Sequence, residues 1–346
     1  MNVLYISCHA VLEFDELKLL NTIPNLHVRS TGAYADPRQH PALRPALPDL
    51  EVSDDHIRNS FLFNTGGHKL NDELLNWADV VIFMHMPEWI HESLDDLDRH
   101  GDVRVIYRSI GQSAPNVETM LRNYSLHFGS RFSIVRYSPN EQFIKNFQKS
   151  DNLIRFYKDP QEFRRTEPPA ASNHILMSTQ NGLGRGNFTH TREALEISAG
   201  HPRLYVGTNN EDIRDHFDCP IANPDYEELK KVYREARIFL YTGTVPASYT
   251  LSFIEALMSG LPIVTISGKM WAKEHLGWIS PDVFEAPEIV GPAATIHSIE
   301  DGQDLLAALM SRNDIIEEWS QFNRDRALEL FAFEPIRDQW RQLLFA

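Results

Sequence analysis

The sequence predicts an α/β protein in which two doubly wound parallel sheets follow one another along the chain. Short apolar runs alternate with amphipathic segments, as in parallel strands that are joined by helices. The alternation stops over residues 158–173, which hold three prolines and many charges, and then starts again. A chain of 346 residues is also longer than most single domains, so two domains are expected.

The expected elements follow from this alternation. In the first half we expect strands at 3–7, 27–30, 79–84, 104–107, 132–136 and 153–157, and helices at 70–78, at 89–98 and from Pro139. In the second half we expect strands at 174–179, 203–206, 238–241 and 263–266, and helices at 189–198, 226–236 and 252–259. The tail, residues 301–346, is expected to be helical throughout.

The domain boundaries come from the same pattern. We expect one domain in residues 1–160, a linker at 158–173, a second domain in 174–330, and a final helix in 331–346 that packs back on the first domain. Two Rossmann-like halves in series leave a cleft between the carboxyl ends of their sheets, where ligands bind in open α/β folds.

Composition limits the classes of function. The net charge of −15 argues against a surface made mainly to grip nucleic acid or an anionic membrane, although a local basic groove is compatible with it. The two cysteines, Cys8 and Cys219, provide neither a disulfide framework nor a metal-site spacing. We find no signal peptide and no apolar run of membrane-spanning length, so we expect a soluble cytoplasmic protein without a required metal.

The segment 241–264 carries the strongest functional signal. An apolar strand runs into a loop of small and hydroxyl-bearing residues, the loop opens a helix, and Gly260 and Pro262 end that helix before another strand. Such a unit directs backbone N–H groups and a helix N-terminus at a phosphate, although the same hydroxyls can also cap the helix. Glu255 lies on the helix as a buried-looking acid that needs a polar partner, and a ligand ribose would be a suitable one.

A glycine-rich loop, residues 181–186, follows the first strand of the second half. Its three glycines let the backbone approach an anion, and Arg185 can clamp a diphosphate in a bidentate way. The loop lacks the Gly-Lys-Ser/Thr of a Walker A motif and the spacing of the dinucleotide fingerprint. A flexible surface turn is the alternative, but its place at the carboxyl end of a strand favours phosphate binding.

Two cations outside these loops are further candidates. Arg108 follows the strand at 104–107 with Gly111 and Gln112, so it is expected at the cleft unless it forms a structural ion pair. Lys158 ends the first domain, and it is either a second phosphate cation or a residue of the linker.

Histidines and acids of the first half give weaker signals. His85 follows a buried strand and could contact a sugar hydroxyl or transfer a proton, with Glu88 assisting, although a lone histidine is more often structural. His9 and the acids at 13–16 follow the first strand, and those acids can simply favour a helix N-terminus. The acidic segments 54–56 and 91–100 are interpreted as solvated surface without a metal.

These residues together suggest a family. The second half resembles the donor domain of nucleotide-sugar-dependent GT-B glycosyltransferases, the group with glycogen-synthase-like and sucrose-synthase-like members. The family motif is Glu, seven residues, Glu, and a helix that ends in Gly-x-Pro-Val/Ile-Val; residues 252–264 match its second half. The segments 175–195, 205–207 and 335–345 match other family features, whereas the first half matches only as architecture. The resemblance implies a GT-B fold, with two Rossmann-like domains facing across a cleft and a C-terminal helix crossing back.

The resemblance also implies roles for individual residues. Glu255 would hold the nucleotide ribose, Arg185 the diphosphate, and the segment 219–221 would lie near the base. The backbone at Tyr249, Thr250 and Leu251 would touch phosphate or sugar, and Gly184, Gly207 and Lys158 complete the expected donor site. We assign the catalytic roles to His85, Arg108 and Arg185.

Two departures from the family pattern bear on catalysis. Ala247 stands where relatives carry the first motif acid, which contacts the donor sugar. The family's phosphate lysine is also missing, so Arg192 or Lys158 would have to substitute.

The sequence therefore predicts a hexosyl- or pentosyltransferase that uses a UDP- or GDP-linked sugar, retains the anomeric configuration and needs no metal. The acceptor is open: a saccharide, a lipid-linked group, a protein or modified nucleic acid. Three alternatives remain, namely a sugar-nucleotide epimerase of this fold, a non-catalytic nucleotide-sugar-binding protein, and a phage-type glycosyltransferase acting on hydroxymethylated DNA bases. The last would need a basic lip formed by Arg29, Arg38, Arg44 and Arg58.

Overall fold

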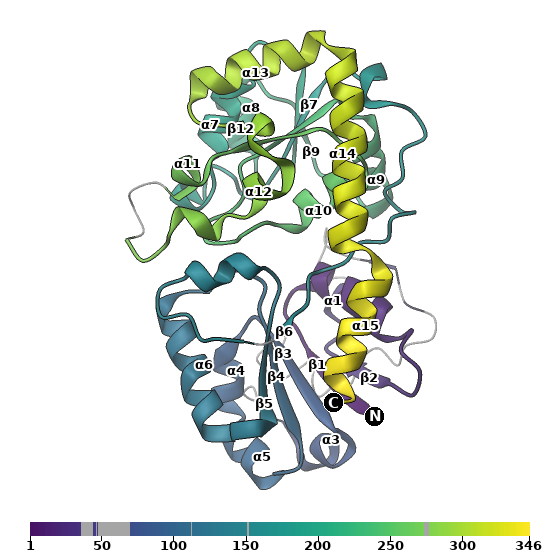
Figure 1. Cartoon of the computed structure of the whole chain (residues 1–346), viewed down its shortest axis with the longest axis vertical. Coiled ribbons are helices and arrows are strands. Elements are labelled where there is room, and N and C mark those ends of the chain that lie inside the picture. The colour runs from purple at the N-terminus through teal and green to yellow at the C-terminus, as the bar shows by residue number, and fades with distance from the viewer. Residues whose placement is uncertain (36–43, 46, 48–69, 112, 151, 273–276) are drawn as a thin grey trace. The chain divides into compact units, whose positions relative to one another are not determined.

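The protein is described here by a computed structural model that covers the whole chain except residues 36–43, 46, 48–69, 112, 151 and 273–276 (Figure 1). The described chain divides into two units. One comprises Met1–Tyr157 and Phe333–Ala346, and the other comprises Lys158–Ala332. Each unit contains one six-stranded sheet whose ladders are all parallel, which confirms the predicted fold class.

The sheet of the first unit has the order β2-β1-β3-β4-β5-β6. Its strands are β1 (Asn2–Ile6), β2 (His27–Ser30), β3 (Val80–Met84), β4 (Arg104–Arg108), β5 (Phe132–Arg136) and β6 (Asn152–Leu153). The central strand β3 is buried throughout, as its apolar sequence predicts. Chain order reverses between β1 and β3, and ligand sites of doubly wound sheets lie at such a reversal.

Helices of the first unit cover this sheet. They are α1 (Ala10–Leu20), α3 (Asp72–Trp77), α4 (Pro87–Glu92), α5 (Leu94–Arg99), α6 (Pro115–Phe128) and the C-terminal α15 (Phe333–Leu344). On α15, Ile336, Trp340 and Leu344 are buried. Arg104 of β4 donates hydrogen bonds to the carbonyls of Leu343 and Leu344 at 2.8 and 2.7 Å. The last helix therefore belongs to the first unit.

The sheet of the second unit has the order β12-β11-β10-β7-β8-β9. Its strands are β7 (Ile175–Ser178), β8 (Arg203–Val206), β9 (Ile221–Ala222), β10 (Ile238–Tyr241), β11 (Ile263–Ile266) and β12 (Thr295–Ile296). Here the reversal of chain order falls between β7 and β10. The loops that follow these two strands are therefore the expected ligand-binding loops of this unit.

Helices of the second unit surround that sheet. They are α7 (Thr191–Ile197), α8 (Glu211–Phe217), α9 (Tyr226–Glu235), α10 (Leu251–Met258), α11 (Gly268–Ala272), α12 (Ala286–Val290), α13 (Ile299–Ser311) and α14 (Asn313–Phe331). The apolar side of α10 is fully buried, and α14 is joined to the end of α10 by a 2.9 Å bond from Nδ2 of Asn323 to the carbonyl of Leu261.

Several elements differ from the sequence expectation. The strand expected at 153–157 pairs only over Asn152–Leu153, and a bond from the Ile154 N–H to the Arg136 carbonyl at 2.9 Å is the last to β5. Ile154, Phe156 and Tyr157 are buried in the core. The helix expected from Pro139 is a single 3₁₀ turn, Pro139–Phe143. The helix expected at 89–98 is broken at Ser93, and the tail forms three helices with breaks at Arg312 and Ala332.

Helices α6, α8, α11 and α12 were not expected from the sequence, and α1 was suggested only by the acids at its start. In α6 the buried positions include Glu118 and Tyr124 as well as Leu121 and Phe128, so a purely apolar stripe is absent. Within the described part of the chain, no helix is long and apolar enough to cross a bilayer.

Candidate functional site

Two loops of the second unit lie side by side at the carboxyl end of its sheet. The first follows β7 and contains the glycines of residues 181–186; the second follows β10 and leads into α10. Thr189 and Thr244 form an antiparallel bridge between them, and the N–H of Val245 donates to the carbonyl of Phe188 at 2.9 Å. The sheet reversal and the two loops expected to bind phosphate therefore coincide.

The glycine loop presents an exposed cation. Arg185 begins a short 3₁₀ turn, and both Gly184 and Arg185 are exposed. Within the described residues the Arg185 guanidinium forms no ion pair, so its N–H groups are available to an anion. A small pocket of about 110 Å³ lies against this loop, and Gly182, Thr191 and Arg192 are among its lining residues.

A buried asparagine that the sequence interpretation missed holds this loop in place. Asn210 has no exposed surface, and its Nδ2 donates to the carbonyls of Thr179 and Gly207 at 2.8 Å each. Its Oδ1 accepts from the N–H of Gly182 at 2.7 Å. The loops after β7 and β8 are thus joined by one side chain. The available signal was its position just before α8, where asparagine is usual.

Gly207 itself is required at the end of β8. Its φ of +138° lies outside the range of most side chains, and a Cβ atom there would approach the Thr179 carbonyl oxygen to 2.3 Å. In the segment 205–207, which resembles the family pattern, this glycine therefore reflects close contact between two loops of the candidate site.

The second loop positions the N-terminus of α10. The N–H of Thr250 donates to the Tyr241 hydroxyl at 2.9 Å, and the Thr250 hydroxyl lies 2.8 Å from that of Ser252. The Thr250 side chain does not cap the helix. Tyr249 is buried against Phe331, whereas Thr250 and Leu251 are partly exposed. The start of α10 is thus partly exposed, at the end of the loop that adjoins the glycine loop.

Glu255 has a polar partner within the chain. Its Oε1 lies 2.8 Å from Nζ of Lys158, and the two residues are 4% and 0% exposed. Tyr233 lies close by, and its pKa is raised by burial and then by the charge of Glu255. Lys158 was expected to be either a phosphate cation or a linker residue, and it is instead a buried part of the second unit. The linker expected at 158–173 therefore begins with a core residue.

The residues around Ala247, which replaces the first acid of the family motif, are tightly packed. Ala247 is buried, and its N–H donates to the Thr244 carbonyl at 2.7 Å. Gly243 has a φ of +72°, and a Cβ atom there would lie 2.7 Å from the Phe284 ring. That ring is stacked on Trp271 with centroids 5.0 Å apart. At the expected base-binding segment, Cys219 is buried and Ile221 and Ala222 are partly exposed.

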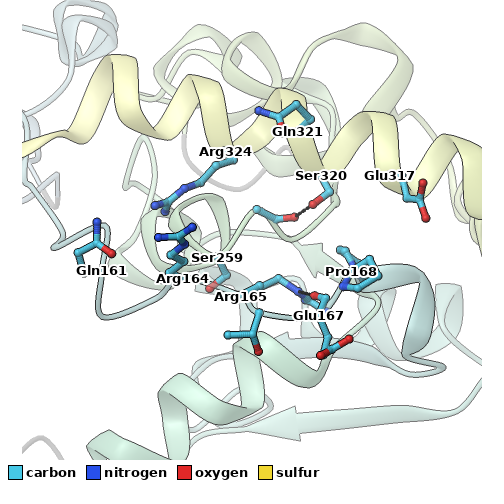
Figure 2. A pocket seen from close by; sticks show the side chains of 13 residues that line it. Gln161, Arg164, Arg165, Glu167, Pro168, Ser259, Glu317, Ser320, Gln321 and Arg324 are labelled. Carbon is cyan, nitrogen blue, oxygen red and sulfur yellow. Dashed lines mark hydrogen bonds between the residues drawn. The ribbon is translucent and has the colours of Figure 1, made fainter.

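A larger pocket of about 670 Å³ lies elsewhere in the second unit (Figure 2). Its walls are the segment 161–169, the C-terminal end of α10 and one side of α14. None of the expected site residues lines it.

His85 lies at the reversal of chain order in the first unit. It has a φ of +74°, which is uncommon for a residue with a side chain and often marks a functional position. Its N–H donates to the Arg108 carbonyl at 2.9 Å, and its carbonyl accepts from the Tyr107 hydroxyl at 3.0 Å. Burial lowers the pKa of the partly exposed imidazole, which favours the neutral form.

Arg108 is part of the core of the first unit. Its side chain is fully buried, and Nε and Nη2 donate to Oε1 of Glu16 at 2.9 and 2.7 Å. Nη1 donates to the Ile154 carbonyl at 2.6 Å, and the guanidinium carbon lies 4.0 Å from the centroid of the Phe156 ring. This geometry favours the structural ion pair over a direct contact with substrate.

Gly111 and Gln112 were expected at the cleft together with Arg108. Gly111 has a φ of +83° and packs against Tyr137, where a Cβ atom would clash with the ring. Gln112 lies outside the described residues.

Glu13 is a buried carboxyl that the sequence suggested only as part of a helix start. It accepts hydrogen bonds from the Thr31 hydroxyl at 2.6 Å and from the N–H groups of Gly32 and Tyr34 at 3.0 and 3.1 Å. Burial nevertheless raises the pKa of Glu13 to about 7. The side chain holds the loop after β2 against α1. His9 caps the same helix, its Nδ1 accepting from the N–H of Leu12 at 3.4 Å.

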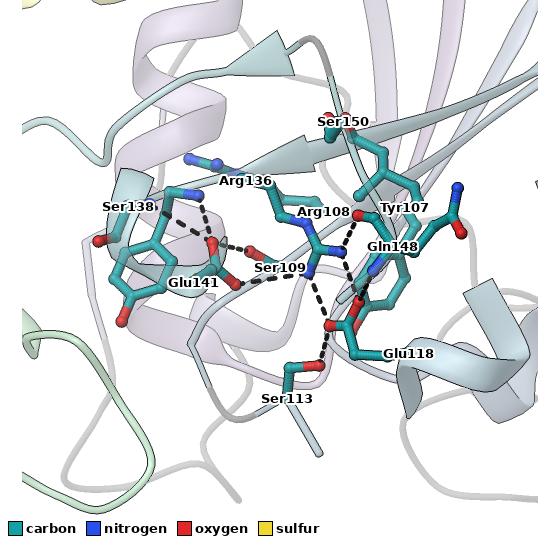
Figure 3. Close-up of polar contacts among 12 residues, drawn as sticks. Tyr107, Arg108, Ser109, Ser113, Glu118, Arg136, Ser138, Glu141, Gln148 and Ser150 are labelled. Atoms are coloured by element: carbon teal, nitrogen blue, oxygen red, sulfur yellow. Dashed lines mark hydrogen bonds and ion pairs between the residues drawn. The ribbon is translucent and has the colours of Figure 1, made fainter. Parts of the chain in front are cut away.

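A buried polar network holds the loops that follow β4 and β5 (Figure 3). Arg136 donates two hydrogen bonds to Glu118 at 2.9 and 2.8 Å. Glu141 accepts from the Ser109 hydroxyl at 2.8 Å and from the Tyr137 N–H at 3.0 Å. Each buried charge thus has a partner, as buried charges require.

The basic lip expected for DNA is only partly described. The Arg29 guanidinium lies 4.4 Å from the centroid of the Trp77 ring, and Arg44 is buried; Arg38 and Arg58 lie outside the described residues. The acidic segment 54–56 also lies outside them. In the part of the chain that is described, no three His, Cys, Asp or Glu side chains are grouped as a metal site requires.

Comparison with known proteins identifies the fold. No protein-family model and no curated protein matches the sequence. Solved structures do match over the whole chain. HepE of Anabaena, in complex with UDP and glucose, aligns with a TM-score of 0.69 at 12% identity over 100% of both chains. The chain has the GT-B fold.

Two further solved structures of similar length also align with the whole chain. A glycosyltransferase from Rickettsia africae aligns with a TM-score of 0.63 at 13% identity, over 99% of this chain and 97% of that one. AviGT4, a glycosyltransferase involved in avilamycin A biosynthesis, aligns with a TM-score of 0.60 at 13% identity, over 99% and 98%. At such identities the likeness shows the GT-B fold alone.

Proposed function

We propose that this GT-B chain is a glycosyltransferase that moves a sugar from a nucleoside diphosphate sugar to an acceptor hydroxyl. The observation that carries the proposal is the pair of adjoining loops at the sheet reversal of the second unit. One loop presents exposed Arg185, and the other leads into the N-terminus of α10. HepE, which shares the fold, has been solved with UDP, with UDP and glucose, and with UDP-glucose, which supports a UDP-linked donor.

The donor site that we propose uses each loop for one part of the nucleotide. The diphosphate lies against Arg185, with Gly184 and Gly207 allowing close backbone approach, and against the backbone of residues 249–251. Glu255 holds the ribose. Lys158, whose Nζ lies 2.8 Å from Glu255, holds that buried carboxyl in place rather than binding phosphate itself.

The proposed chemistry is retaining and independent of metal. The bond between the anomeric carbon and the diphosphate breaks, the acceptor oxygen bonds to that carbon, and the acceptor proton passes to a base, for which His85 is our candidate. Arg185 and the helix N-terminus stabilise the negative charge of the leaving diphosphate, a role that a metal fills in other enzymes. Neutral His85 is our candidate for the contact with a sugar hydroxyl or for proton transfer, and Arg108 positions its loop through the Arg108 carbonyl.

One observation favours a second function, a nucleotide-sugar-binding protein without turnover. Ala247 occupies the position of the first motif acid, and it is buried in a tight turn that leaves no carboxylate there. Turnover separates the two proposals, because both predict that the donor binds.

The test is an assay of nucleoside diphosphate release from a panel of UDP- and GDP-sugars, with a chelator present, against mixed saccharide, lipid-linked, protein and DNA acceptors. The proposal predicts release that depends on one acceptor class and is lost in Arg185→Ala. Donor binding without release for any acceptor would favour the non-catalytic function, and release without an acceptor would indicate hydrolysis. Conversion of the donor into an epimeric nucleotide sugar without release would favour an epimerase.

A further inference from the structure

The 670 Å³ pocket of the second unit is separate from the proposed donor loops. It adjoins Ser259 and Gly260 at the C-terminal end of α10, whereas the donor loops adjoin the N-terminal end of that helix at Thr250. Eight residues of helix separate the two ends, or about 12 Å. A volume of this size is typical of sites for small metabolites.

Three arginines line this pocket: Arg164, Arg165 and Arg324. Counting only described residues, none of their guanidiniums forms an ion pair with a carboxylate. The chain has 48 acidic side chains against 33 lysines and arginines, so three unpaired guanidiniums around one pocket are unexpected from composition. Figure 2 shows the guanidiniums of Arg164 and Arg324 next to each other.

Two of the arginines are held rigidly by backbone carbonyls. Arg324 donates to the carbonyls of Met258 and, at 2.9 Å, Pro160. Arg165 donates to the carbonyls of Tyr233 and Ala236 at 3.2 and 2.8 Å. These bonds end helices α10 and α9, but neutral carbonyls do not cancel the charges. Nη2 of Arg165 is buried and has no hydrogen-bond partner among the described residues.

The guanidiniums of Arg164 and Arg324 therefore lie close enough to repel each other. Burial and then the charge of Arg164 lower the pKa of Arg324, and the nearby charge of Asp325 opposes this effect only in part. An anion placed between them would relieve this repulsion, and phosphate oxygens match the paired N–H groups of guanidinium.

The rest of the wall indicates what else the ligand carries. Gln161, Ser259 and Gln321 offer neutral hydrogen-bonding groups, and Glu167 and Glu317 add two carboxylates. Those carboxylates repel an entirely anionic ligand but accept hydrogen bonds from hydroxyl groups. We propose that this pocket binds a small soluble phosphate ester, with its phosphate on Arg164 and Arg324 and its hydroxyl-bearing part toward Glu317.

The test is calorimetric titration of the full chain with inorganic phosphate and with glycerol 3-phosphate. Arg164 is the residue to change, because it is exposed and its side chain ends no helix. Arg164→Ala should weaken binding about tenfold, since one charge-assisted contact is lost, and Arg164→Glu should abolish it. Arg326→Ala is the matched control on α14, because Arg326 pairs with Glu329 and does not line the pocket.

A second control separates this pocket from the donor site. Arg185→Ala should leave binding of glycerol 3-phosphate unchanged. Loss of binding in Arg185→Ala, unchanged binding in Arg164→Glu, or no binding to the unaltered chain would each overturn the proposal. Sedimentation with phosphatidylcholine vesicles that contain phosphatidic acid tests a lipid headgroup as the source of phosphate. Binding to those vesicles without binding of the free ester would overturn the assignment to a soluble ligand.

Discussion

Nζ of Lys158 lies 2.8 Å from Oε1 of Glu255, and both side chains are buried in the second unit. Lys158 is the first residue of that unit, and Glu255 lies on α10, which follows the loop that adjoins the glycine loop. The ion pair therefore ties the point where the chain enters the second unit to the helix that we propose binds the donor. Its consequences for stability and for binding can be separated by mutation.

Removing one partner of this pair should destabilise the protein strongly. Lys158→Met or Glu255→Leu alone leaves an uncompensated buried charge, at a cost of about 3–5 kcal/mol in the free energy of unfolding. The double variant Lys158→Met/Glu255→Leu should regain most of this loss, because both charges are gone. Denaturant unfolding of the unaltered chain, the two single variants and the double variant gives the coupling free energy between Lys158 and Glu255. A double variant as unstable as the sum of the singles would contradict a buried pair.

Asn210 should matter to both the loops and the nucleotide. Asn210→Ala removes three hydrogen bonds and leaves buried backbone groups unsatisfied, so we expect a loss of about 1–3 kcal/mol in stability. Nucleotide affinity should fall as well, because the glycine loop loses its anchor. The neighbouring exposed Asn209, with a φ of +59°, gives a control in Asn209→Gly, which should change neither quantity appreciably. Unchanged nucleotide affinity in Asn210→Ala would show that the glycine loop does not contribute to nucleotide binding.

Glu13 should make stability fall as pH rises through the neutral range. Its pKa is about 7 in the folded protein against a usual 4.5, so the folded state holds the proton more tightly. Proton binding by Glu13 makes its full contribution to the free energy of unfolding below pH 4.5, and this contribution is lost as pH rises through 7. The loss is about 3 kcal/mol at most. Unfolding at pH 5 and pH 8 should show a smaller change in Glu13→Gln than in the unaltered chain. Exposed Glu73 provides the control Glu73→Gln, and equal changes in all three proteins would refute the assignment.

His85 should affect turnover without affecting donor binding. His85→Asn removes the imidazole but keeps a residue that tolerates a positive φ, so the backbone of the loop should persist. A role in proton transfer predicts a fall in kcat of about 10²–10⁴ with the donor affinity unchanged. The exposed His127, which pairs with Asp98, supplies the control His127→Asn. An unchanged kcat in His85→Asn would contradict a role in proton transfer and would indicate that His85 is structural.

The fold was predictable because the strands are short apolar runs at regular spacing. Both strands that flank the glycine and hydroxyl loops, β7 and β10, were expected within a residue or so of their observed bounds. Helix α6 was missed because it buries the charged Glu118, so hydrophobic periodicity could not identify it. The element at Pro139–Phe143 was expected as a helix, but it is one 3₁₀ turn held by a capping box and has no apolar face to extend it.

The place of a candidate site residue in the fold was predictable only where its position after a strand decides it. Gly184, Arg185 and Thr250 were expected at the carboxyl end of the sheet for that reason, and the structure places them at adjoining loops. Long-range pairing was not readable from the sequence. Arg108 and Glu16 are 92 residues apart, and Lys158 and Glu255 meet only through tertiary packing. A lone charged residue beside a strand therefore did not indicate whether it faces a ligand or the core.

The most direct test of the proposed donor site is calorimetric titration with UDP, without added metal, of the unaltered chain and of Arg185→Ala. Exposed Arg214 in α8 provides the control Arg214→Ala. We predict saturable binding to the unaltered chain and to Arg214→Ala, and an affinity lower by about tenfold or more in Arg185→Ala, whose stability should not change. Equal UDP affinity in all three proteins, or no binding of UDP or GDP to a folded chain, would contradict the account.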